Sequence, residues 1–154
     1  MRPSRDDVLM TSAKVWEARS TCSRAQVGVV ISRDGRILST GYNGAPSGTE
    51  HCHHKCNCAH LEVGHRGPHE EGCPAGPCTK VVHAEANAII FAAKYGVGID
   101  GAEVHTTRVP CMNCAGMIIN AGIKRVVWLA EHRDMEGFLR LGQAGLEVIR
   151  YGHE

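Results

Sequence analysis

Three side chains of the sequence have the types and spacing of zinc ligands: His83, Cys111 and Cys114, here called the ligand trio. Cys111 and Cys114 are three positions apart at the start of an expected helix, so their thiols fall on one face. His83 opens another expected helix, and the unpaired N–H groups at helix starts favour thiolate ligands. Three protein ligands leave one tetrahedral position open, as in a catalytic rather than a structural zinc site.

Glu85 lies two residues after His83, in the first turn of the same expected helix. A carboxylate there can take a proton from water and return it to a leaving group. Together, HAE at 83–85 and PCMNC at 110–114 match the signature of zinc-dependent nucleobase deaminases. A CxxC pair alone would also fit a zinc staple or a redox pair, but a structural site normally has four protein ligands. The motifs therefore favour a catalytic site.

Regular elements surround these motifs. Residues 6–20 have the apolar spacing of a helix, and an RDG turn separates two β-rich runs that predict an antiparallel hairpin over 27–43. From residue 83 onward, helical and β-type segments alternate. Strands are expected at 102–108, 125–130 and 146–151. This alternation predicts an α/β layer architecture with crossover connections. The length of 154 residues suits a single domain spanning 1–154.

A Cys/His-rich insert at about 51–80 has almost no apolar residues, so it cannot supply its own core. Bonds to a metal would order such a loop. We therefore predict a second, structural zinc, bound by residues drawn from Cys52, Cys56, Cys58, Cys73, Cys78 and possibly His65 or His69. The alternative is a disordered loop with reduced thiols. Cys22 is expected to be a small buried residue at the end of the first helix, with a role as a metal ligand as the alternative.

Composition excludes several classes of protein. A formal net charge of +1 with 5% aromatic residues argues against a large nucleic-acid or anionic-membrane surface. No stretch approaches the roughly 18 apolar residues of a membrane span, and the start of the sequence lacks the apolar run of a signal peptide. We expect a location in the cytoplasm, or in the host cytoplasm for a phage-encoded protein, where thiols stay reduced.

Residues from about 19 to 130 resemble the deoxycytidylate (dCMP) deaminases of phages and bacteria, members of the zinc-dependent cytidine and deoxycytidylate deaminase superfamily. The matching segments are VHAEANAI (82–89), PCMNC (110–114), STCSRAQVG (20–28), TGYNGAPSG (40–48) and INAGIKRVV (119–127). GYNG beside HAExNAI is the most discriminating combination, because it resembles the branch that acts on nucleoside monophosphates.

The resemblance implies a three-layer α/β/α fold with a mixed five-stranded sheet and zinc held between two helix starts. It implies hydrolysis of dCMP to dUMP and ammonia, which supplies dUMP for thymidylate synthesis. In that reaction the ligand trio holds zinc and Glu85 shuttles protons. The family also implies a homo-oligomer, with a hexamer as one form, and regulation by a deoxynucleoside triphosphate.

Several residues are candidates for binding the substrate. By resemblance, Asn43 hydrogen-bonds the sugar, and Thr107 and the backbone at Ala84 lie near the pyrimidine. For the phosphate, the candidates are Arg24 and the backbone N–H groups of 44–48. The alternatives are an ion pair at the surface or a subunit interface for Arg24, and a turn residue for Asn43.

One departure from the family pattern leaves the substrate open. Arg108 stands where a hydrophobic residue or histidine is expected, and it could contact a phosphate, a modified base or a neighbouring subunit. The first alternative function is therefore deamination of a modified dCMP, dCTP, free cytidine or a base in RNA. The second is a zinc-stapled, non-catalytic binding module, although such a module would not need an open zinc position beside a carboxylate.

Overall fold

The computed structural model describes residues 2–22, 25–52, 78, 80–132 and 135–152. Its elements are α1 (Arg5–Glu17), β1 (Gly28–Arg33), β2 (Arg36–Tyr42), α2 (Ala84–Lys94), β3 (Glu103–Arg108), α3 (Met112–Asn120), β4 (Arg125–Ala130), α4 (Glu136–Gln143) and β5 (Glu147–Arg150). Most of the predicted insert lies outside the described residues. Among the residues described, no helix has both the length and the apolar character needed to cross a membrane.

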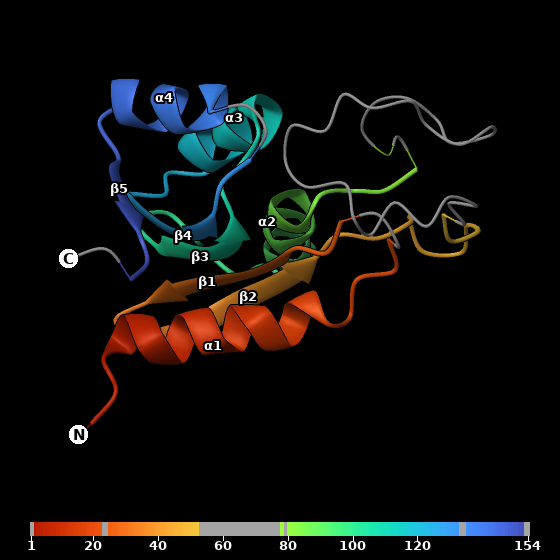
Figure 1. Ribbon diagram of the computed structural model, residues 1–154, viewed down its shortest axis with the longest axis horizontal. Coiled ribbons are helices and arrows are strands. Elements are labelled where there is room, and N and C mark those ends of the chain that lie inside the picture. Colours follow the sequence, from red (N-terminus) through yellow and green to blue (C-terminus); the bar gives the residue numbers. More distant parts are fainter. Residues whose placement is uncertain (1, 23–24, 53–77, 79, 133–134, 153–154) are drawn as a thin grey trace.

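The five strands form one mixed sheet in the order β2-β1-β3-β4-β5. β1 is antiparallel to both β2 and β3, whereas β3, β4 and β5 run parallel to one another. Helix α1 covers one face of the sheet, and α2, α3 and α4 cover the other (Figure 1). The predicted three-layer α/β/α fold with a mixed five-stranded sheet is therefore confirmed.

Local sequence explains how the N-terminal elements begin and turn. Ser4 caps α1 in a capping box, because its hydroxyl accepts from the Asp7 N–H while the Asp7 carboxylate accepts from the Ser4 N–H. In the β1–β2 hairpin, Asp34 and Gly35 have φ angles of 53° and 75°. Two successive positive φ angles suit the right-handed twist of the flanking strands. The predicted antiparallel hairpin is confirmed.

The sheet divides the apolar core in two. Val29, Ile31 and Val104 pack with α2 and α3, whereas Val30 and Val127 pack with α1. Successive side chains of a strand point to opposite faces, so each central strand contributes to both layers. The helices that carry the candidate chemistry consequently rest on one face, and α1 closes the other.

A charged cluster fastens α1 to the sheet. Asp6 accepts hydrogen bonds from Arg125 at 2.7 and 2.9 Å, and its Oδ1 lies 2.9 Å from Nε2 of the fully buried His105. Arg125 also pairs with Glu103 at 2.9 Å. The hydrogen bond from Arg125 is the main cause that lowers the pKa of Asp6 to about 2. Burial lowers the pKa of His105, which favours a neutral ring that donates to Asp6.

We expect Asp6→Asn to lower the free energy of unfolding by about 1–3 kcal/mol at pH 7, because the partly buried Arg125 and the fully buried His105 lose their charged acceptor. The folded-state pKa of Asp6 lies below its unfolded value, so this stabilisation is present above about pH 4 and disappears as pH falls toward 2. Urea denaturation at pH 7 and at pH 3 measures both effects. Asp34→Asn, at an exposed turn that tolerates asparagine, is the control. Equal stability of the two variants at pH 7 would contradict the assignment.

Candidate active site

The structure brings the ligand trio together between the starts of α2 and α3. His83 Nδ1 lies 3.5 Å from Cys111 Sγ and 3.4 Å from Cys114 Sγ. All three ligand atoms lie within 4.8 Å of one another. Tetrahedral zinc, with bonds of about 2.1 Å to nitrogen and 2.3 Å to sulfur, would place such atoms about 3.6 Å apart. The trio therefore fits zinc in donor type and in spacing.

Backbone geometry places these ligands. His83 and Cys111 are the N-cap residues of α2 and α3, with extended backbone and no side-chain capping bond, so both side chains are free to turn toward each other. At Gly137, in α4, a Cβ atom would lie 2.0 Å from the Pro110 carbonyl oxygen. Only glycine allows α4 to approach the turn that carries Cys111 this closely.

The two thiols of the trio shift each other's pKa in opposite directions. A hydrogen bond from Cys114, supported by His83, lowers the pKa of Cys111 to about 3. The hydrogen bond with Cys111 and burial raise the pKa of Cys114. A divalent cation would stabilise a second thiolate beside the first, because a coordinating thiol loses its proton. The donor set is thus suited to a metal rather than to an isolated thiol pair.

Glu85 supplies an acid–base group at the same place. Its side chain is buried, with 5% exposure, and it interacts with Cys114 by a hydrogen bond. Burial is the main cause that raises the pKa of the Glu85 carboxyl. A carboxyl group whose protonated form is favoured by burial can both accept and donate a proton. The structure therefore juxtaposes a metal-type donor set with a candidate proton carrier.

The Asn43 side chain orders a loop in addition to any contact with substrate. Its Oδ1 accepts from Ser20 Oγ at 2.7 Å and from Val27 N at 2.8 Å, while Nδ2 donates to the Ala25 carbonyl at 2.6 Å. An amide nitrogen carries two N–H groups. Among the described residues, one of these two donors has a hydrogen-bond partner, so the other could serve a substrate hydroxyl.

Two of the other residues predicted to bind the substrate, Ala84 and Thr107, are buried in the structure. Ala84 is fully buried in the first turn of α2. Thr107 is also buried, and its hydroxyl accepts from Gly28 N at 3.1 Å and bonds the Glu17 carboxylate. This side chain therefore links β3 to β1 and α1. Arg24, the phosphate candidate, lies outside the described residues.

Arg108 ends β3, three residues before Cys111, and is partly exposed. Glu17, at the end of α1, lies close enough for the Arg108 charge to lower the pKa of its carboxyl, although burial raises that pKa overall. The sequence alone did not link Glu17 to Arg108, because β1, β2 and α2 lie between them along the chain. Arg108 therefore places a positive charge at the end of β3, just before the segment that carries Cys111 and Cys114.

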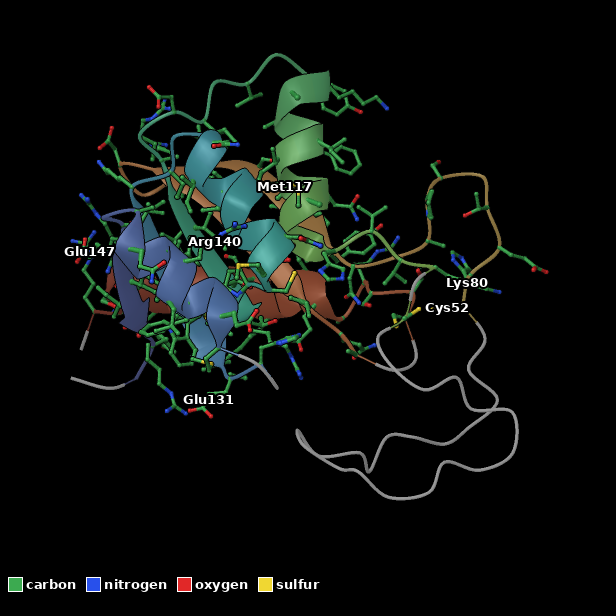
Figure 2. All side chains as sticks on the ribbon, turned by 90° about the horizontal axis from the view of Figure 1, so that it is seen from above. Cys52, Lys80, Met117, Glu131, Arg140 and Glu147 are labelled. Atoms are coloured by element: carbon green, nitrogen blue, oxygen red, sulfur yellow. The ribbon has the colours of Figure 1, made fainter. Side chains whose placement is uncertain are left out.

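Cys22 is buried, as predicted, and it lies close to two cysteines of the insert. Its sulfur lies within 4.8 Å of the sulfurs of Cys52 and Cys78, which favours the alternative of a ligand role. Cys22 and Cys52 are buried, and Figure 2 places Cys52 near Lys80, to one side of the layered helices. Burial and hydrogen bonds with the other two thiols raise the pKa of Cys52 to about 11. The other candidates for the second metal site lie outside the described residues: Cys56, Cys58, His65, His69 and Cys73.

This fold and this donor set are those of a zinc-dependent deaminase. The model of the cytidine and deoxycytidylate deaminase zinc-binding region matches residues 3–130, and the chain belongs to this family. The resemblance seen in the motifs is thereby confirmed.

The relatives of the chain include proteins of bacteria and phages. It is 36% identical over 160 residues to the deoxycytidylate deaminase of Enterobacteria phage T2, with 84% of this chain and 83% of that protein covered. It is 37% identical over 134 residues to ComE operon protein 2 of Bacillus subtilis, covering 86% of this chain but only 62% of that protein. The crystal structure of a dCMP deaminase from cyanophage S-TIM5, in complex with dCMP and dUMP, matches with 34% identity and a TM-score of 0.79, covering 97% and 98% of the two chains.

Proposed function

We propose that this protein hydrolyses dCMP to dUMP and ammonia, and so supplies dUMP for thymidylate synthesis. The observation that carries the proposal is the buried Glu85 carboxyl beside a donor set of one imidazole and two thiols. The names of the relatives support the choice of nucleotide, because deoxycytidylate deaminases of phages match most of this chain. A non-catalytic binding module would have no use for the buried carboxyl group.

The chemistry divides between the metal and the protein. Zinc held by the ligand trio would make a water molecule acidic enough to attack the pyrimidine at neutral pH. Glu85 would take a proton from that water and pass it to N3 as the new C4–O bond forms and the C4=N3 electron pair moves to N3. It would then carry the proton of the new hydroxyl to the amino group, so that the C4–N bond breaks, ammonia leaves and a C4 carbonyl beside N3–H remains. The N–H of Asn43 that has no described partner would hold the sugar, and the buried backbone at Ala84 would exclude bulk water from the pyrimidine.

Substrate choice is tested by measuring ammonia release from dCMP, CMP, dCTP, deoxycytidine and a 5-substituted dCMP. We expect kcat/KM for dCMP to exceed the others at least tenfold, since groups that bind the monophosphate would have no partner in deoxycytidine. A preference for the 5-substituted nucleotide would favour the alternative substrate and indicate a base contact for Arg108. Release of ammonia from none of them would favour the binding module.

We also propose a second, structural zinc, held by Cys22, Cys52 and Cys78 with a fourth ligand from the insert. The proximity of the three sulfurs supports it, and so does the position of Cys52 and Cys78 at the two ends of the segment 53–77. Four metal bonds would close this polar loop without an apolar core. This proposal keeps the chain as one deaminase domain, 1–154, with a metal-tied insert at about 51–80.

A homo-oligomer is proposed for the enzyme, with the helical face over α2, α3 and α4 as the contact surface. Apolar side chains are exposed on these helices: Ile90, Phe91, Tyr95, Met117 and Leu139. Met117 also lines an open groove of about 510 Å³, together with Arg140, and both residues are marked in Figure 2. Apolar surface of this kind is typical of subunit contacts. The hexamer and the deoxynucleoside triphosphate effector remain proposals from the family resemblance.

A further inference from the structure

A single side chain joins the two most discriminating motifs of the sequence. Asn87 belongs to HAEANAI, and its Nδ2 donates to the carbonyl oxygen of Tyr42 at 2.8 Å. The same nitrogen lies 3.5 Å from the carbonyl oxygen of Val82. Tyr42 belongs to the GYNG motif, whereas Val82 directly precedes His83. The reaction described above gives Asn87 no task, so its position needs another explanation.

A second link joins the same two segments. Gly44 and Val82 exchange backbone hydrogen bonds of 3.1 and 2.8 Å. The two links therefore lie on either side of Asn43 along one segment. Along the other, they lie on either side of residues 83–85, here called the catalytic turn. The Asn87 bond and the Gly44–Val82 pair thus fasten both ends of each segment. Together they close a ring of chain that contains Asn43 and the catalytic turn, the two parts that would face the substrate.

Direct backbone contact makes this arrangement sensitive to small movements. A Cβ atom on Gly41 would lie 2.2 Å from the Ala84 carbonyl oxygen and 2.6 Å from Ala88 N. Helix α2 thus rests on β2 with no side chain between their backbones at this point. One turn farther along the helix, Ser39 Oγ donates to the Ala88 carbonyl at 2.7 Å. Side-chain hydrogen bonds therefore fasten α2 to β2 at two points, and the Asn87 bond is the one made to the residue that directly precedes Asn43.

We propose that Asn87 is a positioning residue that sets the distance between Asn43 and the catalytic turn. The inference rests on the proposed function, in which Asn43 holds the sugar and Glu85 moves the proton. Asn87 itself would touch no substrate atom. It acts through the Tyr42 carbonyl, which directly precedes Asn43. A misplacement of about 1 Å between a bound substrate and a catalytic group can cost about 100-fold in rate.

The test compares Asn87→Ala and Asn87→Asp with Ser39→Ala, each in the full zinc-loaded chain. Asn87→Asp keeps the shape of the side chain and removes both N–H donors. Ser39→Ala removes the other hydrogen bond between α2 and β2, so it is matched for lost stability. We expect kcat for dCMP to fall about 10- to 100-fold in both Asn87 variants and less than threefold in Ser39→Ala, with similar Tm values.

A second measurement does not depend on turnover. Groups that orient metal ligands typically change metal affinity about 10- to 100-fold when they are removed. Competition with a chelator should therefore show zinc held at least tenfold more weakly in the Asn87 variants than in Ser39→Ala. Equal kcat and equal zinc affinity in all three variants would overturn the positioning role. A wild-type chain that deaminates no nucleotide, with zinc affinity still lost in the Asn87 variants, would overturn the proposed function and leave the positioning of the catalytic turn intact.

Discussion

Glu85→Gln is expected to abolish deamination of dCMP while the protein stays folded and keeps its zinc. The amide has nearly the shape of the carboxyl, but it cannot carry a proton from water to the leaving amino group. We expect kcat to fall by at least about 1,000-fold. The loss should appear in kcat rather than in KM for dCMP, because the missing interaction acts on the transition state.

Stability provides the first control for this substitution. Burial raises the pKa of the Glu85 carboxyl, so the site disfavours its charged form and a neutral amide should not destabilise the fold. Glu131→Gln, at an exposed surface ion pair with Arg150, is the matched control and should keep full activity. Steady-state rates, zinc content and Tm are measured for all three proteins. Turnover of dCMP by Glu85→Gln at a normal rate would show that another group moves the proton.

The fold was predictable because the elements have distinct sequence patterns. The β-rich runs around the RDG turn predict the hairpin formed by β1 and β2, and the alternation from residue 83 onward predicts the parallel pairs of β3, β4 and β5. The mixed sheet and its three layers were implied by family resemblance instead. The turn residues Asp34 and Gly35 also have the positive φ angles that a tight hairpin requires.

The ligand trio and Glu85 were predictable because all four residues lie at the starts of two helices. Residues at helix starts are identifiable from local sequence, and crossover connections bring such starts to one end of a parallel sheet. The hydrogen bonds of the Asn43 side chain were harder to predict, because its partners are the backbone groups of Ala25 and Val27 and the Ser20 hydroxyl. Nothing in the side chains of those three residues marks them as its partners.

Cys22 shows the main limit of predicting a site from local sequence. It is separated from Cys52 by an entire hairpin, and no fixed spacing relates the two residues. Their proximity depends on backbone contacts of the loop after α1, where Thr21 N donates to the Asn43 carbonyl at 3.3 Å. The Thr21 carbonyl oxygen in turn lies 3.7 Å from the Cys52 sulfur. A cysteine at the end of a helix therefore looked like an isolated core residue.

Zinc content should separate the two proposed metal sites. We expect about two zinc ions per wild-type chain and about one in each of Cys114→Ser and Cys22→Ser. In Cys114→Ser the remaining zinc is the one bound at the insert. The rate of deamination should fall by at least about 1,000-fold, because a catalytic zinc site needs three protein ligands. In Cys22→Ser the ligand trio is intact, and the principal effect should be a lower Tm, since metal bonds at this site stabilise the folded chain.

The double variant, Cys22→Ser with Cys114→Ser, makes the assignment independent of activity. If the two sites are separate, the losses add and the double variant should contain almost no zinc, as measured by elemental analysis of the intact protein. Each single loss would then be assigned to its own cluster, since each group of three sulfur or nitrogen atoms lies within 4.8 Å. Retention of two zinc ions in Cys22→Ser would remove Cys22 from the second site. About one zinc in the wild-type chain, lost completely in Cys114→Ser, would leave the insert without a metal.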